Sequence, residues 1–440
     1  MDCFLRECWQ KKLSRRFPID GAAHSRENIV NTMETIKRCR VCESDKIKPF
    51  FDLGKQPLAN SLLASPNEPE NLYPLSLSWC ENCELVQLNE TIDPKIMFTT
   101  YPWVTGTSKT AKDFAVKFSE EALRRSSSDR PFVLEIASND GTFLAPFIKK
   151  GYKALGVDPA ENIVKDAVKD GIPTLAEFFN ADVAEKVLAK NGPADIVIAR
   201  NVLYHLANLR DVMKGIERVL ANGGVFIAEF HYAGKMLKEL HYDTIYHEHV
   251  CYYTLKTFEK LLGEVGLHAF DIGVSPINSG GLIVYARKAK GEVSTAMERL
   301  REEEKADGAN QFENWKKFGE RAIEHKKKLL FLLKNAAQHE GRPIGWGASA
   351  RSSTMLNFCG ITADMLPVVI DLNPLKQGKY TAGTHIPIKN ADDVMKENPR
   401  TVFLLAWNFR DEIESMLRKK YSFAGECIVP LPGDPRIETI

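Results

Sequence analysis

Residues 132–143 read Phe-Val-Leu-Glu-Ile-Ala-Ser-Asn-Asp-Gly-Thr-Phe. A short apolar run contains Glu135 and is followed by small residues and Gly141, after which a helical pattern begins. This order is typical of a parallel β-strand that runs into a nucleotide-binding turn at the start of a helix. The stretch therefore predicts an α/β domain with a cofactor at this turn.

The composition excludes several classes of protein. The chain has 440 residues, of which 44% are hydrophobic and 27% charged, enough for about two or three globular domains. Its formal net charge of +1 argues against nucleic acid as a partner, because phosphate recognition needs a concentrated basic surface. No apolar run approaches the roughly 18 to 20 residues that span a bilayer, and no signal peptide opens the chain. We expect a cytoplasmic protein that acts on a small molecule.

Four of the nine cysteines form two Cys-x-x-Cys pairs, Cys39 with Cys42 and Cys80 with Cys83. Two such pairs let four thiolates converge tetrahedrally on one zinc ion. A site closed by four protein ligands leaves no position for a substrate, so the predicted zinc is structural. Four buried, reduced thiols without a metal are the alternative.

We place the predicted zinc-binding domain at residues 39–108. One segment precedes it, and a distinctive loop forms its end. Residues 1–38 lack sustained periodicity, and we interpret them as an N-terminal extension; scattered acids argue against a targeting peptide. Residues 101–108, Tyr-Pro-Trp-Val-Thr-Gly-Thr-Ser, form a loop rich in aromatic and hydroxyl side chains. Such a loop is either a lid over a substrate or an interdomain turn.

Strands and helices alternate over residues 109–288, which predicts a parallel sheet with helices on both faces. The charged, helical residues 289–340 are interpreted as a linker. A strand, turn and helix that start at Pro343 predict a second Rossmann-like domain at 341–440. The seven strands expected in the first sheet are 132–136, 154–157, a short one reached through 173–179, 195–200, 224–230, 267–274 and 282–287.

The first turn of this sheet discriminates between cofactors. A dinucleotide site needs Gly-x-Gly-x-x-Gly so that the backbone can approach a pyrophosphate. Here Glu135, Ala137, Asn139 and Gly141 take alternate positions, with one glycine among them. This pattern suits a cofactor without phosphates, because the carboxylate can face an ammonium group. Small residues such as Ser138 would let the amino-acid part of S-adenosylmethionine lie along the loop.

Two further residues are expected at the same edge of the sheet. Asp158 lies 23 residues after Glu135, at the end of the second strand, where it can accept both hydroxyls of a ribose. Asn201 and His205 follow the fourth strand and would line the same crevice. Taken alone, Asp158 could also be a helix N-cap before Pro159.

The catalytic candidates lie in residues 243–254, Asp-Thr-Ile-Tyr-His-Glu-His-Val-Cys-Tyr-Tyr-Thr, in a loop before a predicted helix. A histidine can take a proton near neutral pH, a carboxylate can orient it or raise its pKa, and a tyrosine can donate to an oxyanion. Tyr246, Glu248 and His249 thus suit proton abstraction beside a carbonyl. The histidines and the glutamate of this loop do not have the His-Glu-x-x-His spacing of a zinc site, which argues against a metal site here. A hydrogen-bonded surface loop is the remaining alternative.

The C-terminal segment contains its own candidate for a cofactor site. Gly345, Gly347 and Ala350 fit the dinucleotide fingerprint with its allowed alanine, and Asp371 follows at roughly the expected distance. An NAD-dependent oxidoreductase is therefore a rival hypothesis.

Taken together, the motifs resemble the S-adenosylmethionine-dependent C-methyltransferases that act on nucleotide-linked keto-deoxysugars. The resemblance covers nearly all of residues 39–430. It implies a three-domain α/β fold, in which a small zinc-binding domain and a C-terminal Rossmann-like domain flank a seven-stranded class I methyltransferase core. The segments that carry it are the two cysteine pairs, 135–141, 201–205, 246–249, Gly-Trp-Gly-Ala at 345–348, 371–378, 384–387 and 406–409.

The resemblance also implies residue roles. His249 is the expected base, supported by Tyr246, Glu248 and Tyr101. The C-terminal domain is expected to help hold the nucleotide sugar, which would explain its fingerprint without a nicotinamide cofactor. The residues expected to contact this substrate are His205, Gly345, Gly347, Asp371, Asn373, Lys376 and Asn408.

One stretch departs from the family pattern. Similar proteins often carry His-Gly-Gly-Ser-Leu-Arg near the last strand, where this chain has Asn-Ser-Gly-Gly-Leu-Ile at residues 278–283. The missing arginine and histidine bear on the contact with the sugar or the diphosphate, and so on the identity of the acceptor. A non-catalytic, zinc-stabilised protein that binds sugar nucleotides is a further alternative.

Overall fold

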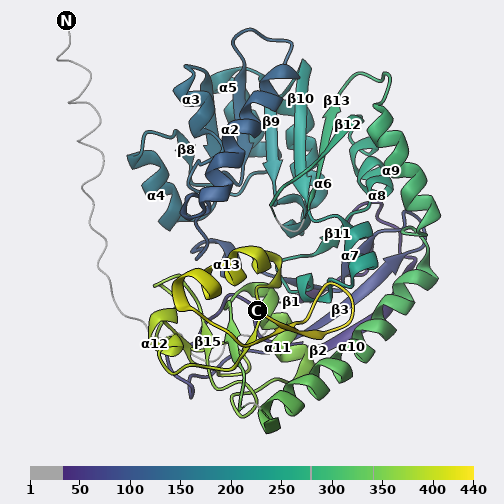
Figure 1. Cartoon of the computed structure of the whole chain (residues 1–440). Coiled ribbons are helices and arrows are strands. Elements are labelled where there is room, and N and C mark those ends of the chain that lie inside the picture. The colour runs from purple at the N-terminus through teal and green to yellow at the C-terminus, as the bar shows by residue number, and fades with distance from the viewer. Residues whose placement is uncertain (1–32, 278–279, 340) are drawn as a thin grey trace, which may run out of the picture. The chain divides into compact units, whose positions relative to one another are not determined.

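The predicted seven-stranded sheet is present in the computed structural model, which describes residues 33–277, 280–339 and 341–440 (Figure 1). Its order is β12-β13-β10-β9-β6-β7-β8, so β6 and β9 are neighbours and the chain turns to opposite sides from them. Such a switch point opens a crevice at the carboxyl ends of the strands. The strands are β6 (Phe132–Ile136), β7 (Lys153–Val157), β8 (Thr174–Leu175), β9 (Ala194–Arg200), β10 (Leu220–Phe230), β12 (His268–Val274) and β13 (Leu282–Arg287).

Both faces of this sheet are buried, which explains why its strands are continuously apolar. In β6, Val133 packs into one apolar cluster with Phe118 and Phe147, whereas the next residue, Leu134, packs into another with Val212. Only β13 breaks the parallel pattern, since it pairs antiparallel with β10 and with β12. The helices in this part are α2 (Lys109–Arg124), α3 (Ala145–Lys149), α4 (Glu161–Lys169), α5 (Ala181–Asn191), α6 (Leu209–Val219), α7 (Ala233–Glu239) and α8 (Leu255–Gly263).

The N-terminal part forms an antiparallel sheet of order β11-β4-β3-β2. Its strands β2 (Ile47–Gln56), β3 (Tyr73–Cys80) and β4 (Val86–Leu88) lie in the predicted zinc-binding segment, but β11 (Cys251–Tyr252) comes from the end of the predicted catalytic loop. Of the predicted extension, residues 1–32 lie outside the described residues. Its last residues form β1 (Met33–Thr35), which pairs with β5 (Glu90–Ile92). A short helix, α1 (Pro94–Phe98), follows β5.

The C-terminal part contains a six-stranded sheet of order β16-β15-β14-β17-β18-β19, parallel except for the last pair. Its strands are β14 (Ile344–Trp346), β15 (Val369–Ile370), β16 (Ile388–Lys389), β17 (Thr401–Phe403), β18 (Glu426–Val429) and β19 (Arg436–Thr439). Helices α11 (Ala350–Cys359), α12 (Ala391–Met395) and α13 (Arg410–Tyr421) accompany them.

The segment predicted as a linker forms α9 (Thr295–Ala306) and α10 (Phe312–His339), the long green helix in Figure 1. Trp315 and Phe318 on α10 are fully buried, and the Phe318 ring meets that of Phe51 in β2 at 6.1 Å. The helix therefore packs against the N-terminal sheet as well as connecting two segments. Over the described ranges, none of the helices combines the length and apolarity of a membrane span.

Candidate active site

The four predicted zinc ligands converge. Their sulfur atoms all lie within 4.8 Å of one another, and the closest pairs, Cys39 with Cys83 and Cys42 with Cys80, are 3.5 Å apart. Four thiolates at such spacing fit tetrahedral zinc. In the part of the chain that the structure describes, this is the single group of three or more histidines, cysteines or acids that could hold a metal ion.

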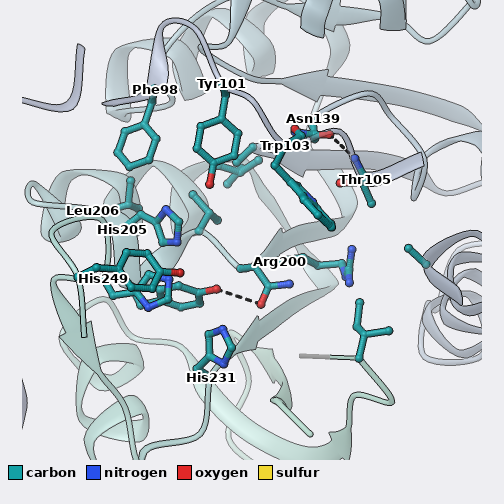
Figure 2. Close-up of a pocket in the computed structure, with 18 of the residues that line it drawn as sticks. Phe98, Tyr101, Trp103, Thr105, Asn139, Arg200, His205, Leu206, His231 and His249 are labelled. Atoms are coloured by element: carbon teal, nitrogen blue, oxygen red, sulfur yellow. Dashed lines mark hydrogen bonds between the residues drawn. The ribbon is translucent and has the colours of Figure 1, made fainter. Parts of the chain in front are cut away.

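The carboxyl edge of the large sheet opens into a cavity of about 1030 Å³. Three parts of the chain line it: the ends of β6, β7, β9 and β10, the loop after β5, and a C-terminal stretch around residues 407–412. Figure 2 shows Phe98, Tyr101 and Trp103 along one side and His231 and His249 along the opposite side. Ten predicted site residues line the cavity: Tyr101, Glu135, Ala137, Asn139, Asp158, Asn201, His205, Tyr246, His249 and Asn408.

The Glu135 carboxyl group faces this cavity from the end of β6. The residue is buried, and one carboxylate oxygen has no hydrogen-bond partner. Burial raises the pKa of Glu135 to about 8, although the nearby Arg200 guanidinium opposes the rise. A cationic group beside Glu135 would satisfy the free oxygen and stabilise the charged form. These features fit the ammonium group of S-adenosylmethionine.

Asp158 organises the turn next to Glu135. Its two carboxylate oxygens accept hydrogen bonds from the backbone N–H groups of Asn139 and Ala160, each at 2.8 Å. Each oxygen keeps a second lone pair for a ligand hydroxyl. Burial raises the pKa of Asp158. The carboxylate thus supports the turn and also lines the cavity at the position expected for a ribose.

The backbone is strained around this end of the cavity. Ala137, Asn139 and Asn201 have φ values of +55°, +52° and +52°, in the left-handed region. Asparagine tolerates that region, but for alanine it costs about 1 kcal/mol or more. Strain of this kind clusters where a ligand must be approached closely.

Two predicted cofactor residues are absent from the described cavity lining, Ser138 and Gly141. At Gly141, with φ +74°, an added Cβ would lie 2.4 Å from Cγ2 of Ile172. This glycine is needed for a tight turn against a buried neighbour. The Ser138 hydroxyl packs under Gly156, where an added Cβ would approach it to 2.3 Å. That both contact the cofactor stays a prediction.

Residues 101–108, the aromatic loop, lie over residues 137–141, the turn predicted to hold the cofactor (the cofactor turn). The Asn139 side chain accepts from the N–H of Thr105 at 2.9 Å and donates to the carbonyl of Trp103 at 3.0 Å. Asp140 accepts from the N–H of Gly106 at 2.8 Å. Because these bonds hold the loop against the cavity, the lid interpretation is favoured over a simple interdomain turn.

His249 is arranged as a neutral base. Its Nδ1 lies 2.8 Å from the carbonyl oxygen of Thr244. A carbonyl only accepts, so Nδ1 carries the proton and Nε2 keeps its lone pair. Burial, followed by the proximity of His205 and His231, holds the pKa of His249 well below its ordinary value. Of the two effects that a neighbouring carboxylate can have, a raised pKa is thus not seen at His249.

Glu248 supports the site in a different way from that expected. Its carboxylate accepts from the Asn60 side chain at 2.6 Å and from the Tyr101 hydroxyl at 3.1 Å. Burial raises the pKa of Glu248 to about 7. The Thr244 carbonyl, rather than Glu248, orients the His249 ring, and Glu248 ties the aromatic loop to the catalytic loop.

Tyr246 lies directly against His249, the predicted base: the two ring centroids are 3.8 Å apart. Burial, followed by the charge of Glu248, raises the pKa of Tyr246 well above its ordinary value. Its hydroxyl therefore stays protonated and can donate a hydrogen bond inside the cavity.

Comparison with known proteins now assigns the family. The C-methyltransferase NovU of Streptomyces niveus is 30% identical over 407 residues, which are 91% of this chain and 97% of that relative. The chain belongs to the C-methyltransferase family. Three family models match it in sequence: a zinc binding domain at residues 39–98, a methyltransferase domain at 110–270 and a C-methyltransferase C-terminal domain at 276–432.

Two other proteins are similar over shorter stretches. The ubiquinone biosynthesis O-methyltransferase of Caulobacter sp. (strain K31) is 29% identical over 118 residues, 24% of this chain and 47% of that protein. The crystal structure of magnesium protoporphyrin IX methyltransferase (ChlM) from Synechocystis PCC 6803 with bound SAM aligns at 15% identity. The alignment covers 41% of this chain and 80% of the ChlM chain, with a TM-score of 0.31.

This C-methyltransferase is a class I enzyme, with S-adenosylmethionine as its cofactor and zinc in its N-terminal part. Its family and its seven-stranded sheet agree with the sequence-based expectation. The hypothesis of an NAD-dependent oxidoreductase is thereby set aside, as is that of a non-catalytic protein.

The fingerprint glycines of the C-methyltransferase serve packing. An added Cβ at Gly345 would lie 2.8 Å from a Leu405 methyl, and at Gly347 it would lie 2.4 Å from the Ala406 methyl. Asp371 accepts from the N–H of Ala348 at 2.9 Å, as Asp158 does in the first turn. The residues predicted to contact substrate that are absent from the described cavity lining are Gly345, Gly347, Asp371, Asn373 and Lys376.

Helix α11, which follows these glycines, holds the catalytic loop. The Arg351 guanidinium donates from two nitrogens to Asp243, at 2.9 and 3.0 Å, and Trp407 donates to the same carboxylate at 2.8 Å. The Thr354 hydroxyl donates to the carbonyl of Ile245 at 2.8 Å. These bonds flank Thr244, whose carbonyl orients the base. The C-terminal part of the C-methyltransferase therefore positions the predicted catalytic loop.

Among the lining residues that the sequence analysis did not name are Arg200, Tyr204 and His231. The Tyr204 and His231 rings lie 4.7 and 5.4 Å from the ring of His249. Burial lowers the pKa of His231 to about 3, so the ring is neutral. Arg200 and His231 are each at or just past the carboxyl end of a parallel strand, a position that could have identified them.

Proposed function

We propose that this C-methyltransferase methylates the carbon next to the ketone of a nucleotide-linked deoxysugar, through an enolate. The observation that carries the proposal is the neutral His249, which lines the cavity shared by the cofactor turn and the C-terminal stretch. An unactivated sugar carbon is far too weak an acid for imidazole. A ketone next to the carbon makes its proton acidic enough, so the base and the keto group are required together.

His249 would remove the proton with Nε2. Its Nδ1–H remains bonded to the Thr244 carbonyl, which fixes the ring orientation and disperses the positive charge that develops. The Tyr246 hydroxyl would donate to the enolate oxygen, since burial keeps it protonated. Glu248 and Tyr101 would close the aromatic loop over the site and exclude water.

Glu135, Asn139, Asp158 and Asn201 would hold S-adenosylmethionine at the carboxyl edge of β6, β7 and β9. When bound, this cofactor supplies an electrophilic methyl group on a sulfonium, which a substrate carbanion can accept. Glu135 would face the ammonium group and Asp158 the ribose hydroxyls.

Other residues that line the cavity suit a nucleotide. Trp103 and Phe409 line it and are about half exposed, at 50% and 46%, so their faces are free to stack on a base. Lys235, Arg410 and Arg436 line it as well and supply positive charge for a diphosphate. Asn408 lies in the same stretch as Phe409. We propose that these residues hold the nucleotide part of the acceptor.

The departure from the family pattern lies close to Lys235. Residues 278 and 279 are outside the described part, but Gly280 is close to Lys235, whose Nζ would lie 3.0 Å from an added Cβ. Ile283, where similar proteins often carry arginine, is buried in an apolar cluster. We propose that Lys235 takes over part of the missing positive charge. We also propose a cytoplasmic enzyme, with domain limits at 39–108, 109–288, 289–340 and 341–440.

The products of turnover test this proposal. The zinc-loaded full chain is incubated with S-adenosylmethionine carrying a 13C methyl group and with a set of nucleoside diphosphate-linked keto-deoxysugars. We expect heteronuclear NMR to place the label on a ring carbon next to the ketone. The same sugars with the ketone reduced to a hydroxyl are the matched controls and should not react. Label on oxygen, or equal transfer to the reduced sugars, would contradict the proposal.

A further inference from the structure

Arg200, the last residue of β9, is a buried cation with unmade hydrogen bonds. It is 8% exposed and lines the cavity. Its Nε donates to Glu229 at 2.7 Å, but its Nη2 has no partner. The guanidinium lies over the Phe143 ring at 3.2 Å from the centroid. A guanidinium has five N–H donors, and leaving one buried and unpaired is costly.

Glu135 lies nearby and, like Arg200, has a buried polar atom without a hydrogen-bond partner. One oxygen of Glu135 is also buried and unpartnered, and the Arg200 charge acts on the pKa of this carboxyl group. The two residues come from adjacent parallel strands, since Ile136 of β6 pairs with Ala199 of β9. The other acid at Arg200, Glu229, is already occupied, because it also accepts from the Ser275 hydroxyl at 2.7 Å.

An acid and a guanidinium side by side, each with one polar atom that lacks a hydrogen-bond partner, match a zwitterion. The amino-acid end of S-adenosylmethionine carries an ammonium and a carboxylate on one carbon, so each would complete one of the two residues. A charge-assisted bond from guanidinium to carboxylate is among the stronger hydrogen bonds in proteins. The apolar rings around Arg200 keep water away and would strengthen it.

We propose that Arg200 binds the cofactor carboxylate and makes this enzyme select ligands that carry an intact α-amino acid. The inference rests on the proposed placement of the cofactor between Glu135 and Asp158, and adds a carboxylate-binding residue to it. The competing account is purely structural: Arg200 only neutralises Glu229.

Calorimetry with two ligands separates these accounts. S-adenosylhomocysteine has the full amino acid, whereas S-adenosyl-3-thiopropylamine lacks only the carboxylate. The zinc-loaded wild-type chain should bind the first about 10- to 100-fold more tightly. In Arg200→Met this ratio should fall to about 1. If the substitution also changes the environment of Glu135, the affinity for both ligands changes alike, because both carry the amine. The ratio of the two affinities is then unaffected. Arg200→Lys should restore part of the preference.

Asp158→Ala is the matched control, because its carboxylate faces the ribose that both ligands share. It should weaken both by a similar factor and leave the ratio unchanged. Where Arg200→Met does not fold, as judged by thermal melting, Arg200→Met with Glu229→Gln removes both members of the pair and takes its place.

The outcomes are distinguishable. A wild-type ratio retained in folded Arg200→Met overturns the role of Arg200 while leaving the cofactor site intact. Unchanged binding of both ligands by Asp158→Ala overturns the cofactor placement, and this inference with it.

Discussion

Replacing His249 by asparagine should lower kcat by about 100- to 10,000-fold, the usual contribution of a general base. Asparagine can keep a donor towards the Thr244 carbonyl but has no group that accepts a proton near neutral pH. The affinity for S-adenosylhomocysteine should stay within about 2-fold, because His249 lies on the opposite side of the cavity from the cofactor turn (Figure 2). Steady-state kinetics and calorimetry measure the two effects.

His247→Asn is the matched control for this experiment. His247 is in the same loop and is also buried, but its Nε2 donates to the Pro74 carbonyl at 2.9 Å, and it is absent from the described cavity lining. Its loss should affect thermal stability more than kcat. Equal losses of kcat in the two variants would mean that His249 acts through the loop structure alone.

The pH dependence of the wild-type enzyme follows from the lowered pKa of His249. The base is active when neutral, and a lowered pKa extends the neutral form to lower pH. With saturating S-adenosylmethionine, so that the ionisation of Glu135 does not contribute, the acidic limb of kcat/KM for the acceptor should fall below pH 6.5, the ordinary pKa of histidine. In the folded state the buried ring also resists protonation, so its contribution to stability is present above that pH and is lost as the pH falls below it. An acidic limb above pH 7 would contradict this assignment.

Removing zinc should have the largest effect on stability. Structural zinc contributes about 10 to 16 kcal/mol in zinc-finger peptides, comparable to the whole folding free energy of many domains. The four cysteines hold the turn before β2 and the turn between β3 and β4, and β4 pairs with β11, which begins two residues after His249. Loss of zinc should therefore loosen the N-terminal sheet and one end of the catalytic loop.

We expect a strong chelator, or Cys80→Ser, to lower the melting temperature by about 10 °C or more and to abolish turnover. Mass spectrometry of the native protein should find one zinc ion per chain. Cys427→Ala is the control, because this cysteine is buried in a different apolar cluster and has no part in the metal site. Full activity and an unchanged melting temperature after zinc is removed would refute a structural role.

Patterns of neighbouring residues in the sequence predicted those parts of the fold that depend on neighbouring residues. Strand β6 has the limits expected from its apolar run, because the sheet is buried on both faces. The cysteine pairs converge because a Cys-x-x-Cys turn has little freedom; Glu43 and Glu84 follow the two pairs in the same left-handed conformation. Asp158 lies at the cofactor turn because parallel strands end at one edge.

Contacts between distant segments could not be predicted. The partner of Glu248 is Asn60, 188 residues earlier in the chain, and no local pattern links them. The fingerprint at Gly345 was ambiguous, because the sequence alone does not distinguish a glycine that leaves room for a phosphate from one that leaves room for a neighbouring side chain. Gly347 leaves room for the Ala406 methyl. Arg200 was overlooked for a related reason: its position at the end of β9 is visible in the sequence, but the neighbouring carboxyl group with an unpartnered oxygen is not.

Hydrogen exchange at the acceptor carbon tests the central claim most directly. The enzyme is incubated in D2O with a nucleotide-linked keto-deoxysugar and S-adenosylhomocysteine, so that deprotonation can occur without methyl transfer. The wild-type chain should incorporate deuterium next to the ketone, as measured by NMR and mass spectrometry, and His249→Asn should not. A variant that incorporates deuterium as fast as the wild type, or a wild-type enzyme that methylates this carbon without any exchange, would contradict proton abstraction by His249.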